Sequence, residues 1–343
     1  MRALCKTAPG KGNVELREVP RPSPSPGEVL VRVRAAGICG SDLHIQEGDT
    51  QVALDPPVVM GHEFAGVIEE VGADAREFSV GERVTGEPTY RVCGHCPHCK
   101  AGSYNLCRER RVLGYAADGA FAELVRVPCA RVHRLPANVD FSSGALTEPL
   151  ACCVHGVYEG VGVTANELAL VIGPGAIGLL VLQLLRNAGA RTMVIGTSAD
   201  EERLRLAHAL GADVAIDLSK TDAHRAVAEA SDGAGVDLVV ECSGAEAAAT
   251  LGLELARRQG RYAQIGLFGR PIRLDFEKIA YKELRVTGSF AQKWSSWRTA
   301  LSLMAGGRVR LAELVTDILP LEDWQSGFQR FREKKGIKFV LTP

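Results

Sequence analysis

Hydrophobic and polar positions follow two different patterns along the chain. In the first third, short runs rich in valine and leucine are separated by turn-forming residues, and Val29–Arg34 alternates apolar and polar positions with a period of two. That period is typical of a strand with one face in water. Strand-like alternation returns at Gly119–Val127, so the N-terminal part of the chain is predicted to be rich in β-structure.

From residue 168 onward, short apolar runs alternate with segments of helical periodicity. The predicted strands are Leu168–Ile172, Thr192–Gly196, Val214–Leu218, Val236–Cys242, Arg261–Phe268 and Leu284–Phe290. The predicted helices are Leu179–Asn187, Asp200–Leu210, Ala223–Ala230 and Ala245–Arg258. Strands that alternate with helices indicate a parallel sheet covered on both faces, which is an α/β fold.

Length and charge narrow the choice of function. A chain of 343 residues is long enough for two domains, and its formal net charge is -1 at pH 7. A nearly neutral chain gives no electrostatic argument for nucleic acid or an anionic membrane as the partner. The sequence starts without an apolar signal segment and has no apolar run near the roughly 20 residues of a membrane span, so a cytoplasmic protein is expected.

A glycine-rich turn follows the first predicted strand of the α/β part. The run Gly173-Pro174-Gly175-Ala176-Ile177-Gly178 lies between a strand and a helix, which is the context of a dinucleotide-binding turn. There the first glycine allows the tight bend, the second admits a pyrophosphate and the third lets helix and strand pack. The free N–H groups at the helix start bind the anion. The candidate cofactor-binding residues are therefore Gly173, Gly175, Ala176, Ile177 and Gly178.

The second strand of the α/β part ends without the acidic residue that binds a free ribose 2′-hydroxyl. Thr197 and Ser198 stand there, and Arg203 could reach a 2′-phosphate from the next helix. The acidic run Asp200–Glu202 would repel that phosphate. The sequence therefore leaves NAD and NADP both open, with Ser198 and Arg203 as the candidate residues.

Four of the ten cysteines form a tight cluster. Cys93, Cys96, Cys99 and Cys107 have the spacing C-x2-C-x2-C-x7-C, and this segment of about residues 90–110 is called the four-cysteine lobe here. In a chain expected in the cytoplasm, such clustering favours a metal over disulfides. Four thiolates at these spacings fit a closed tetrahedral zinc, which holds a loop together and does no chemistry. An iron–sulfur cluster normally closes with a three-residue gap, so it fits less well.

A second set of metal donors lies nearer the N-terminus. Cys39, His62 and Glu63, called the three-donor set here, combine a thiol, an imidazole and a carboxylate in apolar surroundings, where an ionisable group is costly to bury uncompensated. Three protein ligands with a vacant position are typical of a catalytic zinc site. Neighbouring strand residues point to opposite faces. Both His62 and Glu63 therefore reach one ion only if the backbone bends near Gly61; otherwise Glu63 lies behind the ligands.

Ser41, His44 and Glu148 carry less information by themselves. Ser41 would suit the cap of a short helix at Asp42–Gln46, and His44 would suit its exposed face. Glu148 lies in the run Thr147-Glu148-Pro149-Leu150, where the first turn of a helix favours a carboxylate through the macrodipole.

Together these motifs resemble the zinc-dependent medium-chain dehydrogenase/reductase family over essentially the whole chain. The motifs are C-G-S-D-L-H at 39–44, G-H-E-F-A-G-V-I-E-E-V-G at 61–72, the four-cysteine lobe, T-E-P-L at 147–150 and G-P-G-A-I-G at 173–178. Within the family the chain looks most like the branch of sorbitol/L-iditol (polyol) and threonine dehydrogenases.

The resemblance implies a definite architecture. Residues 1–152 and 289–343 are expected to form a GroES-like, β-rich catalytic domain, and residues 153–288 an inserted Rossmann domain that binds NAD or NADP. The family members that the chain resembles are commonly homotetramers, so a homotetramer that acts on a small molecule is expected.

The resemblance also implies the roles of the site residues. The three-donor set is expected to hold a catalytic zinc, with Glu148 either a direct ligand or bridged through water, and the four-cysteine lobe a structural zinc. Zinc lowers the pKa of a bound hydroxyl. The proton is expected to leave through Ser41 and a ribose hydroxyl toward His44, because an imidazole suits proton transfer at neutral pH.

Two places differ from the polyol enzymes that the chain resembles. Those enzymes carry an aromatic residue after the histidine of the first motif and a Phe-Arg-Tyr run in the late substrate loop, whereas this chain has Ile45 and Phe290-Ala291-Gln292. Threonine dehydrogenases typically have Asp where Glu148 stands. Trp297 is expected either to line the substrate pocket or to begin the core face of a helix.

The expected function is therefore hydride transfer between a secondary alcohol and NAD or NADP, catalysed by a zinc-dependent alcohol or polyol dehydrogenase. The alcohol is expected to be a polyol, a sugar alcohol or a diol. The alternatives are oxidation of an amino alcohol, as in L-threonine 3-dehydrogenase, and a non-catalytic zinc-binding interaction protein.

Overall fold

The computed structural model describes residues 1–343, and the chain folds into two compact units. Met1–Ala151 and Gln292–Pro343 form one of them, the split unit, and Cys152–Ala291 form the other, the inserted unit. The sequence placed the boundaries after residues 152 and 288, close to these positions. The chain thus leaves the split unit once and returns to it once.

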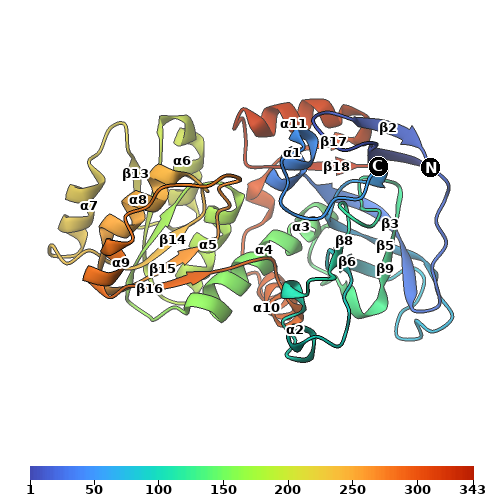
Figure 1. The fold of residues 1–343 in the computed structure, drawn as a ribbon, viewed down its shortest axis with the longest axis horizontal. Coiled ribbons are helices and arrows are strands. Elements are labelled where there is room, and N and C mark those ends of the chain that lie inside the picture. Colours follow the sequence, from blue (N-terminus) through green and yellow to red (C-terminus); the bar gives the residue numbers. More distant parts are fainter. The chain divides into compact units, whose positions relative to one another are not determined.

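The inserted unit is built on one parallel sheet. Its strand order is β13-β12-β11-β14-β15-β16, and all neighbouring strands are parallel. The strands are β11 (Leu168–Ile172), β12 (Arg191–Gly196), β13 (Val214–Asp217), β14 (Val236–Glu241), β15 (Ala256–Gln264) and β16 (Arg285–Gly288). The helices around it are α5 (Ala176–Asn187), α6 (Glu201–Ala209), α7 (Ala223–Ala230), α8 (Glu246–Leu255) and α9 (Glu277–Lys282), as Figure 1 shows.

Burial explains why the central strands are apolar throughout. All five residues of β11 are buried, because a parallel sheet covered on both faces leaves no strand face in water. The predicted α/β fold is confirmed by this sheet. Strand β11 and helix α7 also have the predicted bounds.

The end of helix α8 was predicted wrongly. The sequence extended this helix to Arg258, but it ends at Leu255 and strand β15 begins at the next residue. Ala256 pairs with Val236 of β14, and Arg257 Nε donates a hydrogen bond of 2.6 Å to Asp237. Gln259 has a left-handed φ of 56°, which ends the helical pattern. Contacts with the sheet thus override the local helical periodicity.

The split unit is built mainly on antiparallel strands. Its largest sheet has the order β10-β6-β5-β3-β18-β17 with β9 beside β3, and two small sheets have the orders β2-β1-β4 and β7-β8. The strands are β1 (Arg2–Lys6), β2 (Val14–Glu18), β3 (Glu28–Gly37), β4 (Val58–Val59), β5 (Glu63–Val71), β6 (Arg83–Gly86), β7 (Thr89–Arg91), β8 (Arg111–Val112), β9 (Leu124–Pro128), β10 (Val132–Arg134), β17 (Val315–Pro320) and β18 (Lys338–Thr342). The predicted β-rich domain is confirmed.

Short helices connect these strands. They are α1 (Gly40–Glu47), α2 (Pro97–Lys100), α3 (Phe141–Ala145), α4 (Thr147–Val154), α10 (Trp294–Ala305) and α11 (Trp324–Arg332), and α4 continues into a π-helical segment at His155–Val161. Trp297 of α10 is fully buried, and its ring stacks on that of His133 with centroids 5.1 Å apart. Trp297 is therefore a core residue and does not line a pocket.

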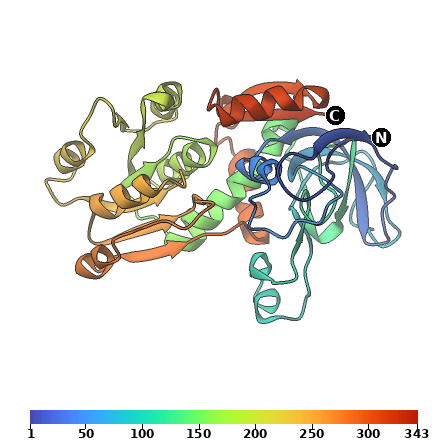
Figure 2. The same ribbon diagram turned by 45° about the horizontal axis from the view of Figure 1, so that its top comes forward.

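The last strand of the chain completes the sheet that the N-terminal part begins. Strand β18 pairs with β3, where Val340 lies opposite Gly37. Figures 1 and 2 show α11 and the C-terminal end, in red, beside the blue N-terminal segment. This pairing places Lys338 beside the start of β5. None of the helices combines the length and the apolar character that crossing a membrane requires.

Candidate functional site

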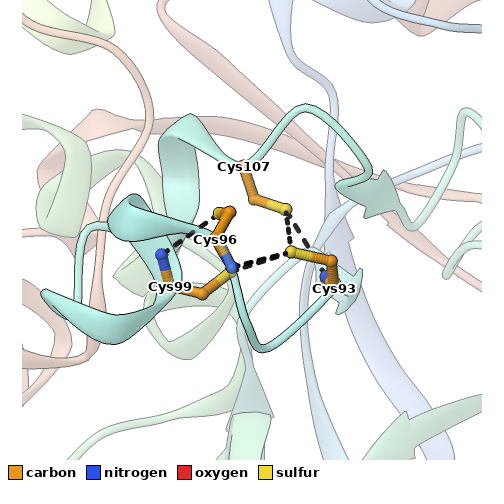
Figure 3. A group of neighbouring side chains, drawn as sticks. All are labelled: Cys93, Cys96, Cys99 and Cys107. Atoms are coloured by element: carbon orange, nitrogen blue, oxygen red, sulfur yellow. Dashed lines mark hydrogen bonds between the residues drawn. The ribbon is translucent and has the colours of Figure 1, made fainter.

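The four cysteines of the four-cysteine lobe point toward a common centre (Figure 3). Cys93 Sγ lies 3.9 Å from Cys99 Sγ and 3.6 Å from Cys107 Sγ, and the four sulfur atoms lie within 4.8 Å of one another. A tetrahedral zinc with Zn–S bonds of about 2.3 Å places its sulfurs about 3.8 Å apart. These distances fit one zinc ion and are far longer than the bond of about 2 Å in a disulfide.

Backbone amides of the lobe favour ionised sulfur. The amides of Cys96 and Cys99 donate to the preceding cysteine sulfurs at 3.3 and 3.4 Å, and the amide of Cys93 donates to Cys107 Sγ at 3.4 Å. Hydrogen bonds from the amides of Cys96 and His95 lower the pKa of Cys93 to about 6. Burial and the neighbouring cysteines raise the pKa of Cys99 to about 12, so Cys93 is the sulfur predisposed to the thiolate form that binds a metal.

The three-donor set also converges. Cys39 precedes α1, Glu63 is the first residue of β5, and the Sγ, imidazole and carboxylate donors of Cys39, His62 and Glu63 lie within 4.8 Å of one another. The bend expected at Gly61 is present: its φ is 88°, and a Cβ atom there would lie 2.6 Å from the ring of Phe121. A left-handed glycine thus lets two adjacent residues face one centre.

His62 is packed between polar side chains. Its Nε2 lies 3.4 Å from Ser41 Oγ, its Nδ1 lies 3.7 Å from Asp42 Oδ1, and its ring centroid is 5.7 Å from that of Tyr115. Burial lowers the pKa of His62, but Asp42 and the Cys39 thiol outweigh burial and raise it to about 10. The buried atoms His62 Nδ1 and Asp42 Oδ1 have no hydrogen-bond partner. A carboxylate behind Nδ1 leaves Nε2 as the atom that faces a metal.

Charge at this centre favours a bound cation. Asp42, Glu63 and Glu148 are all buried, and Lys338 is the buried lysine among them, with its Nζ 2.6 Å from Glu63 Oε1. Burial opposes the charge on Lys338, yet Glu63 and Cys39 keep its pKa above the ordinary value. Lys338 and a protonated His62 supply two positive charges against three carboxyl groups, and ionisation of the Cys39 thiol on metal binding would add a further negative charge. The donor set therefore fits a divalent zinc, with Glu63 shared between the centre and Lys338.

Glu148 stands next to this centre without joining the group of converging donors. It is in the first turn of α4, as its position in the sequence indicates, and it is buried. Gln292 Nε2 donates a hydrogen bond of 2.9 Å to Glu148 Oε1. The charge of Glu148 raises the pKa of His62 and of Tyr115, after larger effects that include burial and Cys39, so its carboxylate lies within electrostatic range of the centre.

In helix α1, the structure places Ser41 inside the helix instead of at its cap and His44 on the expected exposed face. The N-cap of α1 is Cys39, and Ser41 lies inside the helix. Asp42 Oδ2 accepts from the Cys39 amide at 2.9 Å and so fixes the start of α1 two residues earlier than expected. The Ser41 hydroxyl is thereby left to face His62. His44 is on the exposed side, where its Nδ1 lies 3.0 Å from Asp49 Oδ1.

The glycine-rich turn has the geometry that its sequence predicts. Gly173 has a φ of 97° and would place a Cβ atom 2.7 Å from Ser243, whereas a Cβ atom on Gly178 would lie 2.0 Å from the Gly173 carbonyl oxygen. No atom lies within 4 Å of the Cβ position of Gly175, so its backbone is open to a ligand. Ala176 and Ile177 are the first two residues of α5 and present free N–H groups there.

The end of strand β12 shows how the acidic run is used. Asp200 is buried and its Oδ2 accepts hydrogen bonds from Thr197 at 2.9 and 3.1 Å. Arg203 Nη1 donates to Asp200 Oδ1 at 3.1 Å, so the guanidinium lies against that carboxylate. Ser198 is exposed in the short helical turn Ser198–Asp200 that follows strand β12. Asp200 is therefore occupied within the fold, and Thr197 and Ser198 are the exposed hydroxyl residues at the strand end.

Sequence reasoning missed four residues of the three-donor site: Asp42, Tyr115, Gln292 and Lys338. The charged side chain in C-G-S-D-L-H was available as a signal for Asp42, since a metal-binding histidine usually donates its second ring nitrogen to a carboxylate, a carbonyl or water. Lys338 lies 275 positions from Glu63 in the sequence, and no local pattern connects them.

Comparison with known proteins gives the same family for both units. The family described as "Alcohol dehydrogenase GroES-like domain" matches residues 25–137, and the family described as "Zinc-binding dehydrogenase" matches residues 176–306. A sorbitol dehydrogenase from Halalkalibacterium halodurans is 43% identical over 100% of this chain and 99% of its own length. An L-threonine 3-dehydrogenase from Bacillus subtilis is 37% identical over 100% of this chain and 99% of its own length.

A solved structure is similar over the same extent. A zinc-binding dehydrogenase from Sinorhizobium meliloti 1021 bound to NADP superimposes with a TM-score of 0.91 at 35% identity and covers 100% of this chain and 99% of its own.

Proposed function

We propose that the chain, which belongs to the zinc-dependent medium-chain dehydrogenase/reductase family, oxidises a secondary alcohol group of a polyol, sugar alcohol or diol. Members of this family are alcohol dehydrogenase-type oxidoreductases that use zinc and NAD(P). The carbon that bears the hydroxyl loses a hydride to the oxidised nicotinamide, and the hydroxyl loses its proton to solvent. The products are a ketone, reduced NAD(P) and one proton, and the reverse reaction uses the same groups.

The observation that carries this proposal is the convergence of Cys39, His62 and Glu63 with only three donors. Bound zinc would lower the pKa of a substrate hydroxyl at the vacant position, and the nicotinamide would accept the hydride. Cys39 and His62 would hold the ion, and Asp42, which lies behind His62 Nδ1, would orient the imidazole. Glu63 would be either a direct ligand of the ion or, through its contact with Lys338, a buried counter-charge. Glu148 would bind the ion either directly or through a water molecule.

Ser41 and His44 are proposed to pass the proton from this centre to solvent. Ser41 Oγ is beside His62 Nε2, where it can donate to and accept from a substrate oxygen. His44 is in the same helix and partly exposed, so its imidazole can exchange protons with water. The ribose hydroxyl of the cofactor is expected to connect them.

Gly173, Gly175, Ala176, Ile177 and Gly178 are proposed to bind the pyrophosphate. The open backbone at Gly175 and the free N–H groups at the start of α5 support this role. For the ribose, Ser198 is an exposed residue just after β12, and Arg203 would have to leave Asp200 to bind a 2′-phosphate. NAD and NADP remain alternatives.

The second candidate is oxidation of an amino alcohol. The 37% identity with an L-threonine 3-dehydrogenase over the whole chain favours it. A panel of polyols, diols and amino alcohols assayed with both nicotinamides separates the two candidates. We expect the highest kcat/KM with a polyol or diol; a higher value for threonine supports the second candidate, and no turnover of any alcohol contradicts the proposed function.

A further inference from the structure

Glu241 is a buried carboxylate whose partners are all neutral hydrogen-bond donors. It is the last residue of β14 in the inserted unit and is 0% exposed. Its Oε1 accepts from the Ser243 amide at 2.7 Å, from the Gly244 amide at 3.1 Å and from the Ser243 hydroxyl. Its Oε2 accepts from Gln264 Nε2 at 2.6 Å. A buried carboxylate needs such donors because they replace the water that it has lost.

These donors join two loops at the carboxyl end of the parallel sheet. Ser243 and Gly244 follow β14, and Gln264 ends β15. The amide of Gly266, in the second loop, donates to the backbone carbonyl of Glu241 at 2.9 Å. A Cβ atom on Gly266 would lie 2.5 Å from Glu241 Oε2, so a larger residue would push the carboxylate away. The side chain of Glu241 therefore fixes both loops.

The first of these loops lies against the glycine-rich turn. Glu241 is opposite Ile172 in the pairing of β14 with β11, and the Cys242 amide donates to the Ile172 carbonyl at 2.9 Å. Gly173, the next residue after β11, would place a Cβ atom 2.7 Å from Ser243. The position of Ser243 thus limits how the turn can bend. Ligands of open parallel sheets bind at this carboxyl edge of the sheet.

We propose that Glu241 is a positioning residue for the dinucleotide. It holds Ser243 against Gly173 and so keeps the glycine-rich turn in the form that admits a pyrophosphate. Because no part of Glu241 reaches the surface, it acts on the ligand through the loop. This inference rests on the proposed function, since the pyrophosphate is that of the nicotinamide cofactor.

The test separates the pyrophosphate from the rest of the nucleotide. Glu241→Gln keeps the size of the side chain, but its amide nitrogen places a donor among donors. The Ki values of ADP-ribose and of adenosine are measured in competition with the cofactor, with their 2′-phosphorylated forms if the enzyme prefers NADP. We expect the Ki of ADP-ribose to rise about tenfold, the effect of one mismatched buried hydrogen bond. The Ki of adenosine, which has no pyrophosphate, should stay unchanged.

A positioning role also predicts a split between the steady-state constants. In Glu241→Gln the KM of the nucleotide should rise by the same factor as the Ki of ADP-ribose. The value of kcat at saturating nucleotide and the KM of the alcohol should stay those of the unmodified enzyme, because the zinc ligands belong to the split unit.

Glu167→Gln is the matched control. Glu167 is also a buried carboxylate of the inserted unit, but it precedes β11 at the amino end of the sheet and pairs with Arg261. This variant should lower the Tm and leave both Ki values unchanged. If Glu241→Gln does not fold, Gln264→Met removes one donor from Glu241 and should raise the Ki of ADP-ribose in the same direction.

Each outcome decides one question. An unchanged Ki of ADP-ribose in a folded Glu241 variant overturns the inference while the proposed function stands. An equal rise in the Ki of adenosine assigns Glu241 to the stability of the whole inserted unit and also overturns it. A lower Tm with an unchanged KM of the nucleotide has the same meaning. If the unmodified protein binds neither NADH nor NADPH, the proposed function itself fails.

Discussion

Cys39 has two structural roles at the start of helix α1. Its backbone is the N-cap of that helix, with extended dihedral angles, and its amide donates to Asp42. Its thiol belongs to the three-donor set with His62 and Glu63. The backbone role tolerates a serine, whereas the thiolate role does not, because a hydroxyl remains protonated at neutral pH and is a weak zinc ligand.

We therefore predict that Cys39→Ser lowers the zinc content by one ion per chain and reduces dehydrogenase activity by at least about 100-fold. The Tm should stay close to that of the unmodified protein. Metal analysis, an alcohol oxidation assay and thermal unfolding measure the three quantities. Cys153→Ala, a buried cysteine of the inserted unit, is the control for loss of a thiol. Activity retained by Cys39→Ser contradicts the catalytic role of this residue.

Ser198 is the residue through which nucleotide preference is expected to change. It is exposed at the end of β12, where a carboxylate would accept a hydrogen bond from a ribose 2′-hydroxyl and repel a 2′-phosphate. Ser198→Asp should raise the ratio of kcat/KM for NAD to that for NADP about tenfold. Ala234→Asp adds the same charge at an exposed turn and should leave the ratio unchanged. No change with Ser198→Asp means that the ribose is bound elsewhere.

The residues that sequence predicted at the three-donor site are those whose chemistry is unusual for their surroundings. A thiol, an imidazole and a carboxylate among apolar residues indicate a possible metal site, and Gly61 predicts the bend that brings two of them together. Lys338 and Gln292 are ordinary residue types in ordinary local patterns. Only the pairing of β18 with β3 and the return of the chain at residue 292 reveal that they face Glu63 and Glu148.

At the scale of the elements, the four-cysteine lobe depends on its metal. Its helix α2 has four residues, Cys96 is the N-cap, and the neighbouring elements are equally short. Segments of this length do not hold a helix by themselves. The lobe therefore needs the bonds between sulfur and zinc to keep its shape.

Cys99→Ser is predicted to remove one zinc per chain and to make the lobe the first site of proteolysis. Loss of a structural zinc ligand should lower the Tm, because the lobe loses the ion that orders it. Limited proteolysis with mass spectrometry locates the cleavage. His98→Ala is the matched control, since His98 is exposed in the same helix and is outside the sulfur cluster. Unchanged zinc content in Cys99→Ser contradicts a four-sulfur site.

Strand β3 carries a buried carboxylate that ties three strands together. Glu28 Oε1 lies 2.5 Å from Tyr90 Oη of β7, its Oε2 accepts from the Ser25 amide at 3.0 Å, and Arg126 of β9 is 3.7 Å away. Burial would raise the pKa of Glu28, but the hydrogen bonds from Tyr90 and Ser25 lower it below the ordinary value. Because the pKa of Glu28 is lower in the folded state than in the unfolded state, ionised Glu28 stabilises the fold at a pH above its unfolded-state pKa. This stabilisation is lost as the pH falls through the folded-state pKa.

Glu28→Gln should therefore lower the free energy of unfolding at pH 7 by roughly 1.5–3 kcal/mol, the range for a hydrogen bond to a charged group. The difference between variant and unmodified protein should shrink as the pH falls through the lowered pKa of Glu28, where the carboxylate becomes protonated. Denaturant unfolding of both proteins at pH 7 and at acid pH measures this difference in the free energy of unfolding. Glu277→Gln, at an exposed glutamate, is the control. A difference that does not depend on pH assigns the effect to packing.

Most elements of the inserted unit could be predicted because each buried strand and each amphipathic helix has its own period. The bounds of β11 and α7 were predicted correctly for this reason. The end of α8 could not be predicted, because Ala256 and Arg257 continue a helical pattern and leave it only through contacts with Val236 and Asp237 of a neighbouring strand.

At the scale of the whole molecule, the split unit contains two donor sets of different kinds. The four-cysteine lobe offers four sulfurs, and the three-donor set offers three donors and a vacant position. An open site exchanges its ion with solvent more readily than a closed one, because a chelator can approach through the vacant position.

The homotetramer that the family resemblance implies stays a prediction, which light scattering of the purified protein tests.

We predict that a chelator removes zinc in two stages. The first ion lost should be that of the three-donor set, with complete loss of activity and little change in Tm, and added zinc should restore the activity. The second should be that of the four-cysteine lobe, with a marked fall in Tm. Metal content, activity and Tm followed on the same samples measure the order. Unfolding that precedes the loss of activity contradicts this assignment.

The insertion of one unit into the other has a consequence for recombination between homologues. The chain leaves the split unit after Ala151 and re-enters it at Gln292, and Glu148 and Gln292 touch each other from the two sides of that excursion. A chimera joined at these two points exchanges the nucleotide-binding segment and retains the parental pair. Crossovers even a few positions further out would separate the two partners or import a foreign pair, so that a graft intended to change the coenzyme would also disturb the carboxylate beside the three-donor set.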